Sequence, residues 1–229
     1  MIQNRKVALT YRTFAFIIAV AGFLSMSGLC RGTFHAGIMM FYTMQSNLIG
    51  IALLGILIVK TIRNLRENKI GHPGYYPQLE MVVSVILFIT FLVYWVMLAP
   101  RTFMMATEFD LWSFGNLAVH GLTPLLVLLD YILFSPLGHL RYRDIYYIAI
   151  YPLAYVLFTS IVGLLGYVYY ISPVDSLPVR FPYFFFDFDR IGGLSFVFIG
   201  ALVAFFLLIG HIFYALDRQR ARRRASKNG

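Results

Sequence analysis

A threonine and a histidine on two different apolar segments are the residues of this sequence whose types could do chemistry together. Thr43 and Asn47 stand four residues apart in one apolar run, and Asn116 and His120 stand four apart in another. Residues four apart lie on one face of a helix, so each run presents a short polar patch. An imidazole that takes the proton of a hydroxyl creates a nucleophile able to attack an ester carbonyl. If the patches face each other, they predict a site for acyl transfer or hydrolysis.

Amide side chains near this pair are candidates for stabilising the charge that develops on the carbonyl oxygen. Asn47 and Asn116 could each donate an N–H to that oxyanion, and Gln45 lies in the same run as Asn47. Asp130 does not complete a Ser-His-Asp type of triad, because it lies about 15 Å beyond His120 along the same helix. Asp130 is expected near the other end of that helix, where it pairs with a loop cation or caps a neighbour.

The composition excludes a water-soluble globule. The chain has 229 residues, of which 60% are hydrophobic and 13% charged, whereas soluble domains have about half and about a quarter. Lipid is therefore the expected solvent for most of the surface. Six apolar runs each approach the ~20 residues that span ~30 Å of hydrocarbon. They predict an all-α polytopic fold with transmembrane helices near residues 13–30, 38–59, 79–99, 114–134, 145–169 and 192–215.

Basic residues between these runs predict the orientation in the membrane. Fifteen Lys and Arg residues, Arg12 among them, fall in the N-terminal segment, the second and fourth loops and the tail. The remaining four, Arg101 among them, fall in the other loops. Because cytoplasmic segments carry the excess of Lys and Arg, both termini are predicted to be cytoplasmic in a multi-pass protein of the cell membrane. We divide the chain into a six-helix domain, 1–216, and a basic cytoplasmic tail, 217–229.

This orientation places Thr43 and His120 at one depth. Thr43 lies about five residues after the outer start of its run, and His120 about six. At 1.5 Å per residue, both lie roughly 7–9 Å below the outer boundary. The two patches can then satisfy each other's hydrogen bonds, which lipid cannot do. A structural alternative stays open, because Thr, Asn and His side chains also serve as hydrogen-bonding contacts between transmembrane helices.

The outer loop at 172–191 is rich in proline and aromatic residues. Its prolines exclude a regular helix, and its aromatic cluster favours the membrane interface. The loop, with Pro182, Tyr183 and Asp187, is either a lid over an outward-opening cavity or an interfacial anchor that touches no site. The sequence leaves both alternatives open.

The remaining charged and metal-ligating residues point to no cofactor. The tail at 217–229 follows a span directly, so we expect it to contact anionic lipid headgroups and no nucleic acid. Glu80 begins the third run and is expected as an interfacial charge. His120 and His211 lie near opposite ends of their runs, so one haem iron cannot reach both. The other histidines lack the spacing of zinc ligands, and no metal is predicted.

Two non-catalytic functions also stay open. One is a small protein that binds or transports lipid and recognises a headgroup with its polar patch. The absence of an internal repeat counts against alternating access. The other is a scaffold subunit that uses Ser46 and Gly50 as a contact face of small residues, a common pattern in membrane helices.

Three stretches of the sequence resemble the androgen-induced membrane protein family and its bacterial six-helix relatives. They are Phe41-Tyr-Thr-Met-Gln-Ser-Asn-Leu48, Asn116-x-x-x-His120 followed by Pro124 and Asp130, and Phe181-Pro-Tyr-Phe-Phe-Phe-Asp187. Their order and their positions among the six runs are similar to those of the family over most of the chain.

The resemblance implies an integral membrane hydrolase, since members of this family hydrolyse fatty acid esters of hydroxy fatty acids. It implies Thr43 as nucleophile and His120 as general base, with a lipid ester as substrate. The chain departs from the family in three ways. Pro124 stands one residue nearer to His120 than in the animal members, Asp130 replaces a Glu, and the loops are shorter. These departures bear on the choice of substrate more than on the catalytic pair.

Overall fold

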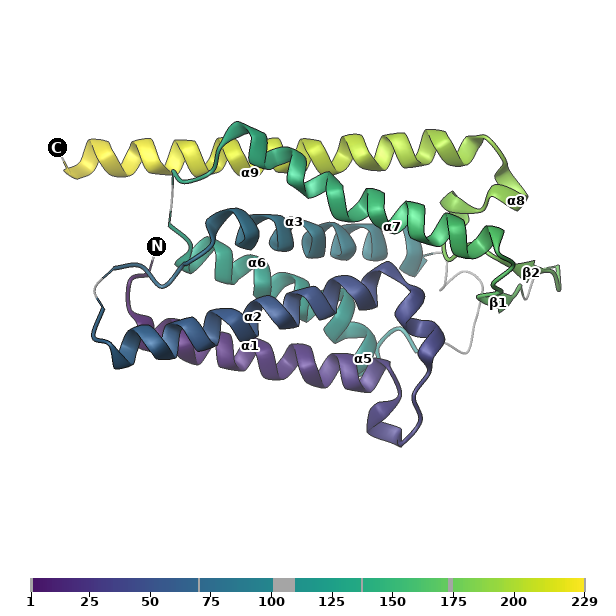
Figure 1. Ribbon diagram of the computed structural model, residues 1–229, viewed down its shortest axis with the longest axis horizontal. Helices are drawn as coiled ribbons and strands as arrows, with labels where there is room; N and C mark the ends of the chain where they lie inside the picture. The colour runs from purple at the N-terminus through teal and green to yellow at the C-terminus, as the bar shows by residue number, and fades with distance from the viewer. Residues whose placement is uncertain (1, 70, 101–109, 137, 173–174, 229) are drawn as a thin grey trace.

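Six apolar helices make up most of the protein (Figure 1). The computed structural model describes residues 2–69, 71–100, 110–136, 138–172 and 175–228, so Arg101 lies outside the described residues. The six helices are long and apolar enough to cross a membrane, which confirms the predicted fold class. They span Arg5–Met26, Tyr42–Arg66, Pro77–Leu98, Phe114–Phe134, Tyr142–Leu164 and Leu194–Arg223.

Two of these spans contain a turn of π-helix. The third span joins α3 (Pro77–Val93) to the π turn η3 (Tyr94–Leu98). The fourth consists of α5 (Phe114–Leu117), the π turn η4 (Ala118–Leu122) and α6 (Thr123–Phe134). The other long helices are α1 (Arg5–Met26), α2 (Tyr42–Arg66), α7 (Tyr147–Leu164), which follows the 3₁₀ turn η5 (Tyr142–Tyr146), and α9 (Leu194–Asn228).

Short elements connect the spans at one end of the bundle. A hairpin of β1 (Tyr170–Ile171) and β2 (Pro178–Val179) follows α7, and the 3₁₀ turn η6 (Phe184–Phe186) and α8 (Phe188–Ile191) lead into α9. Two 3₁₀ turns, η1 (Leu29–Arg31) and η2 (Ala36–Met40), lie between α1 and α2.

The first helix begins at Arg5, well before the apolar run at 13–30 that predicted it. The Asn4 side chain caps its first turn by accepting two backbone N–H groups, as helix N-caps do. Arg12, expected in the N-terminal loop, lies inside α1 with its side chain fully buried. A charge inside a span shortens the apolar run, so the predicted start was wrong.

Arg12 is buried because it forms an ion pair with Asp130 of α6. Its Nε lies 2.8 Å from Asp130 Oδ1, and its Nη2 lies 3.0 Å from Oδ2. Its Nη1 donates to the Thr61 hydroxyl at 2.9 Å and to the Pro73 carbonyl at 2.7 Å. Asp130 therefore pairs with a cation, as expected, but this cation lies in a helix and not in a loop.

Glu80 is also buried, so the expectation of an interfacial charge was wrong. Its side chain accepts the backbone N–H groups of Tyr75 and Tyr76 at 2.8 and 2.9 Å. It also accepts the hydroxyl of Ser135, just beyond α6. Glu80 thus fastens the loop before α3 to the end of the fourth span.

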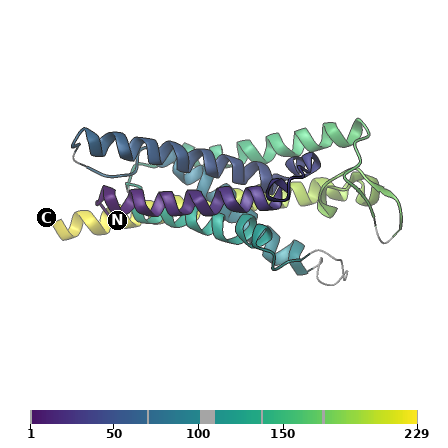
Figure 2. The same ribbon diagram turned by 90° about the horizontal axis from the view of Figure 1, so that it is seen from below.

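The first four spans pack together, and α7 and α9 lie beside them against α3 (Figures 1 and 2). Small residues bring α1 close to the fourth span, because a Cβ added to Gly22 would lie 2.3 Å from the Ala118 Cβ. The four-span core consists of Ala15, Ala19, Leu53, Leu54, Leu57, Val83, Leu87 and Val127. A second core joins α3, α7 and α9 through Met81, Val85, Ile89, Leu140, Ile148 and Phe206.

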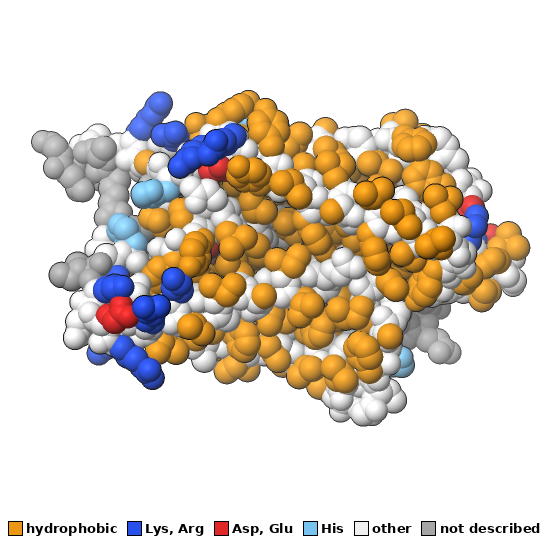
Figure 3. Space-filling view, viewed as in Figure 1, with side chains coloured by type: hydrophobic (Ala, Val, Ile, Leu, Met, Phe, Trp, Pro, Cys, Tyr) orange, Lys and Arg blue, Asp and Glu red, His pale blue; other side chains and the backbone are white. Residues whose placement is uncertain are grey.

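Both chain termini lie at one end of the bundle, which we call the terminal end (Figure 1). On the face shown in Figure 3, Lys and Arg side chains gather at this end and apolar side chains cover the middle. The cytoplasmic location of the termini stays a prediction. No backbone boundary marks residue 216, because α9 continues without a break to Asn228 and Asp217 accepts the Gly138 N–H at 2.9 Å.

Candidate functional site

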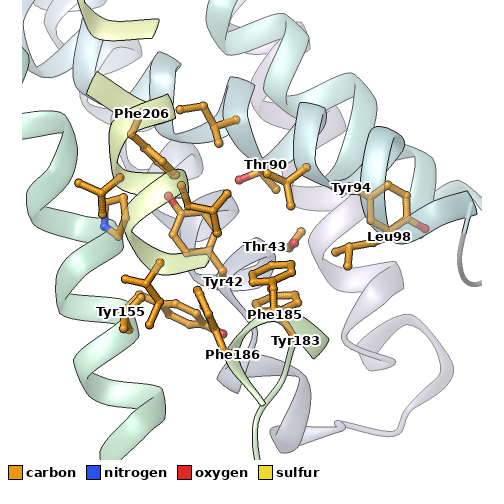
Figure 4. A pocket seen from close by; sticks show the side chains of 17 residues that line it. Tyr42, Thr43, Thr90, Tyr94, Leu98, Tyr155, Tyr183, Phe185, Phe186 and Phe206 are labelled. Atoms are coloured by element: carbon orange, nitrogen blue, oxygen red, sulfur yellow. The ribbon is translucent and has the colours of Figure 1, made fainter. Parts of the chain in front are cut away.

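Thr43 lines an apolar cavity at the end of the bundle opposite the termini (Figure 4). The cavity lies between α2, the third span, α7, α9 and the segment before α8. Its volume is about 60 Å³. Pockets for drug-sized ligands are typically about 300–1,000 Å³. A lipid chain therefore enters only if side chains of the wall move.

The segment between α7 and α9 places a tyrosine on Thr43. Tyr183 lines the cavity, and its hydroxyl lies within hydrogen-bonding contact of the Thr43 side chain and of Tyr155. Burial raises the pKa of Tyr183 to about 12, so this hydroxyl keeps its proton at neutral pH. The Tyr183 ring stacks on Phe185 with centroids 5.2 Å apart and meets Phe41 edge-on at 6.2 Å. These ring contacts fix the hydroxyl beside Thr43.

The other two residues of the predicted lid hold the segment and do not line the cavity. Pro182 is buried. Asp187 is 3% exposed, accepts the backbone N–H of Arg190 and pairs with the Arg190 guanidinium at 2.9 Å. Phe185 and Phe186 join Tyr183 in the wall. The segment thus contacts the Thr43 cavity directly, as a lid requires.

His120 lies in the π turn η4 with a defined tautomer. Its Nδ1 lies 3.2 Å from the carbonyl oxygen of Asn116. A carbonyl only accepts hydrogen bonds, so Nδ1 carries a proton, and when the ring is neutral Nε2 carries the lone pair. The imidazole is 6% exposed. Such a ring is in the form that a general base needs.

Tyr94 covers one face of this imidazole. The two rings stack with centroids 3.5 Å apart and an interplanar angle of 15°. The Tyr94 hydroxyl donates to Asn116 Oδ1 at 2.8 Å, and Figure 4 shows that it points away from Thr43. Tyr94 also contributes to the cavity wall. The ring of Tyr94 is therefore shared between His120 and the Thr43 cavity.

Pro124 explains why the fourth span has a π turn at His120. Thr123 N–H bonds to the Ala118 carbonyl, five residues back, and Pro124 has no N–H. The carbonyls of Val119 and His120 consequently lose their usual partners within the helix. Asn47 Nδ2 donates to Val119 at 2.9 Å, and Trp95 Nε1 donates to His120 at 3.0 Å. Donors from two other spans thus replace the missing bonds.

The side-chain amide of Asn47 links the backbone of α2 near Thr43 to the backbone of η4 near His120. Asn47 Nδ2 lies 2.8 Å from the Thr43 carbonyl and 2.9 Å from the Val119 carbonyl. Two carbonyl oxygens that share one nitrogen are neighbours, so α2 and η4 lie side by side at this height. The shared depth expected from charge bias and helix rise agrees with this bridge.

The structure does not bring Thr43 and His120 into direct contact. Among the described residues no hydrogen bond joins their side chains, and His120 is absent from the cavity wall. Thr43 meets Tyr183, whereas His120 meets Tyr94. Tyr94 contacts the imidazole and also lines the cavity, and the expected direct contact of the pair is not seen among the described residues.

The three predicted supporting amides hold backbone and neighbouring side chains. Asn47 uses both N–H bonds of its amide on carbonyls, so it has none to offer an oxyanion. Asn116 Nδ2 donates to the Leu111 carbonyl at 2.7 Å. Gln45 Nε2 donates to the Met39 carbonyl, and its Oε1 accepts the Tyr151 hydroxyl. None of the three lines the cavity.

Sequence reasoning missed Tyr94 and Trp95, the two neighbours of His120 on the third span. Pro124 was the available signal, since a proline four residues after His120 leaves the His120 carbonyl without its helical donor. That signal predicts a donor from another span but does not say which one.

The histidines form no metal centre among the described residues, where no group of three metal-ligating side chains occurs. His211 faces the Leu207 carbonyl and the Tyr142 hydroxyl. Comparison with protein-family models, with curated proteins and with solved structures finds no match to this chain. The family resemblance therefore rests on the three stretches of sequence alone and stays a prediction.

Proposed function

We propose that the protein is an integral membrane hydrolase of lipid (fatty acyl) esters in the cell membrane, with Thr43 as nucleophile and His120 as general base. The observation that carries this proposal is the placement of Thr43. Its hydroxyl, on a side chain 8% exposed, lines an apolar cavity beside the helix turn that bears the His120 imidazole. An apolar cavity suits an acyl chain, and a hydroxyl at its wall suits attack on the attached ester.

The proposed reaction needs only the ester and water. The Thr43 oxygen forms a bond to the carbonyl carbon while its proton passes to His120 Nε2. The carbonyl electron pair moves to oxygen and returns as the bond to the alcohol oxygen breaks. The departing alcohol takes the proton from His120. Water, activated by the same imidazole, then attacks the acyl-Thr43 ester, releasing the fatty acid and restoring both side chains.

His120 does not line the cavity, so this proton transfer requires the wall at Tyr94 to shift. The Tyr94 ring covers His120 at a centroid distance of 3.5 Å and belongs to the cavity wall. An acyl chain also requires the wall to move, because about 60 Å³ is too little space for it. In this proposal, one movement of the cavity wall at Tyr94 therefore both admits the substrate and exposes the imidazole.

A non-catalytic lipid-binding protein is the second candidate. The specific observation in its favour is that His120 stacks on Tyr94 and does not line the cavity that Thr43 lines. In this case the cavity holds an acyl chain and the hydroxyls of its wall hydrogen-bond the head of the lipid. Anionic lipid headgroups are proposed partners of the exposed arginines Arg218, Arg220 and Arg222 in either case.

Purified protein in lipid nanodiscs tests the proposal with a fluorogenic long-chain acyl ester and a fluorophosphonate probe. Hydrolysis and labelling are expected for the unaltered chain and for Thr90→Ser, which changes another cavity threonine. Thr43→Ala is expected to abolish both, and His120→Ala to lower the rate at least 100-fold. Labelling of Thr43→Ala at the original rate would overturn the nucleophile assignment. Binding of lipid without turnover in the unaltered chain would favour the second candidate.

A further inference from the structure

We infer that Tyr183 stabilises the oxyanion at Thr43, so that the segment between α7 and α9 supplies a third catalytic group to the site. The inference rests on the proposed function and deepens it. Thr43 lies on α2 and Tyr183 on the segment before η6, yet both line one cavity (Figure 4). The Tyr183 hydroxyl lies within hydrogen-bonding contact of the Thr43 side chain.

The attack of Thr43 on an ester creates a negative oxygen that needs a hydrogen-bond donor. The amide N–H bonds of Asn47 are both engaged with carbonyls, and neither Asn47 nor Asn116 lines the cavity. The imidazole of His120 takes the proton from Thr43 in the proposed reaction and cannot at the same time donate to the oxyanion. A donor has to come from elsewhere in the wall.

Of the other four wall hydroxyls, three are held by partners, and the fourth, that of Tyr42, is buried without one among the described residues. Thr90 donates to the Ile86 carbonyl at 3.0 Å, and Tyr155 donates to the Met40 carbonyl at 3.0 Å. Tyr94 donates to Asn116. Tyr183 is the wall residue whose hydroxyl contacts the Thr43 side chain itself. The Tyr183 hydroxyl is therefore placed to donate a hydrogen bond to the carbonyl oxygen of an ester that Thr43 attacks.

The step is balanced without a further reactant. When the Thr43 oxygen bonds to the carbonyl carbon, the carbonyl π electrons move to oxygen, and this oxygen accepts the O–H of Tyr183. When the electrons return to re-form the carbonyl, the alcohol leaves and Tyr183 keeps its proton. The hydroxyl stays protonated throughout at neutral pH because burial raises its pKa to about 12. Without substrate, the same hydroxyl contacts the Thr43 side chain.

Tyr183→Phe tests this role, with Tyr169→Phe as the matched control. Tyr169 is a second tyrosine that packs edge-on against Phe41, with centroids 5.6 Å apart, and it does not line the cavity. Loss of one oxyanion donor typically lowers kcat by about 100- to 1,000-fold. We expect that fall for Tyr183→Phe with KM changed less than threefold, and rates within threefold of the unaltered chain for Tyr169→Phe.

The outcomes separate this inference from the proposed function. If Thr43→Ala abolishes turnover while Tyr183→Phe retains it, the oxyanion role is wrong and the hydrolase proposal stands. If Thr43→Ala retains turnover, the hydrolase proposal itself fails. If Tyr183→Phe melts at a lower temperature, replacement of Tyr183 by 3-fluorotyrosine preserves the ring and strengthens the donor. A changed kcat at unchanged KM then supports the role, and an unchanged kcat overturns it.

Discussion

The indole N–H of Trp95 donates to the carbonyl oxygen of His120 at 3.0 Å, in the position where a regular helix would place the N–H of residue 124. Residue 124 is a proline. The third span therefore completes a hydrogen bond that the fourth span cannot make for itself. Because the carbonyl belongs to His120, this contact fixes the backbone from which the imidazole projects.

Replacing Trp95 by Phe removes this donor while keeping an aromatic ring. A carbonyl left unpaired inside the protein costs free energy, about 1–3 kcal/mol for a buried group. We expect the free energy of unfolding in mixed micelles to fall by about 1 kcal/mol for Trp95→Phe. Trp112→Phe is the control, since Trp112 is 71% exposed. Equal stability of the two variants would contradict the bond to His120.

Replacing Asn47 by Leu separates α2 from the π turn at η4. The amide serves the carbonyls of Thr43 and Val119, both in the interior. We expect a loss of about 1–2 kcal/mol, near the upper end for hydrogen bonds between membrane helices. Asn64→Leu, on the same helix and half-buried, should change the unfolding free energy by less than half as much. A spin-label distance between α2 and η4 that stays unchanged in Asn47→Leu would count against the bridge.

The Arg12–Asp130 pair predicts an asymmetric pattern of stability. Asp130→Asn leaves the fully buried guanidinium without its counter-ion, and removing one partner of such a pair costs about 3–5 kcal/mol. Arg12→Leu combined with Asp130→Leu removes both charges and should cost less than Asp130→Asn alone. The unfolding free energies of the single and double variants measure this coupling. Additive losses would show that the two side chains do not depend on each other.

Acid should loosen the segment between α7 and α9. The hydrogen bond from Arg180 lowers the pKa of Asp189 below its ordinary value, which is about 3.9. A carboxylate with a lowered pKa stabilises the fold above its ordinary pKa, and this contribution is lost as the pH falls through the lowered value. Protease cleavage within 175–191 should therefore quicken below about pH 3.9 and be constant above about pH 5. Arg180→Gln should remove that change, and an identical profile in this variant would contradict the role of the pair.

Much of the fold follows from the sequence because apolar run length reports the thickness of hydrocarbon directly. The six spans were predicted on that basis, and the beginning of α1 was missed because Arg12 interrupts the run. In the amino-acid sequence, a cation that is paired inside a helical bundle cannot be distinguished from a cation in a loop. Only the position of Asp130 in three dimensions distinguishes the two cases.

The candidate site was harder to predict because rise along a helix gives depth but not rotation. Depth placed Thr43 and His120 together, and the bridge through Asn47 joins their backbones. The π turns that begin at Tyr94 and at Ala118 each rotate the following side chains about the helix axis. The direction in which those side chains point therefore cannot be derived from a spacing of four residues. This is why Tyr94, and not Thr43, meets the imidazole.

The unbroken last helix also has a mechanical consequence. With 35 residues at 1.5 Å each, α9 measures about 52 Å, whereas hydrocarbon is about 30 Å thick. Roughly 20 Å of it therefore protrudes as a stiff stalk that is continuous with a wall of the cavity. A fluorophore attached at Arg222 would be rigidly coupled to Phe206, which lines the cavity. A change in the tilt of α9 at the cavity would therefore be measured as a displacement of the fluorophore.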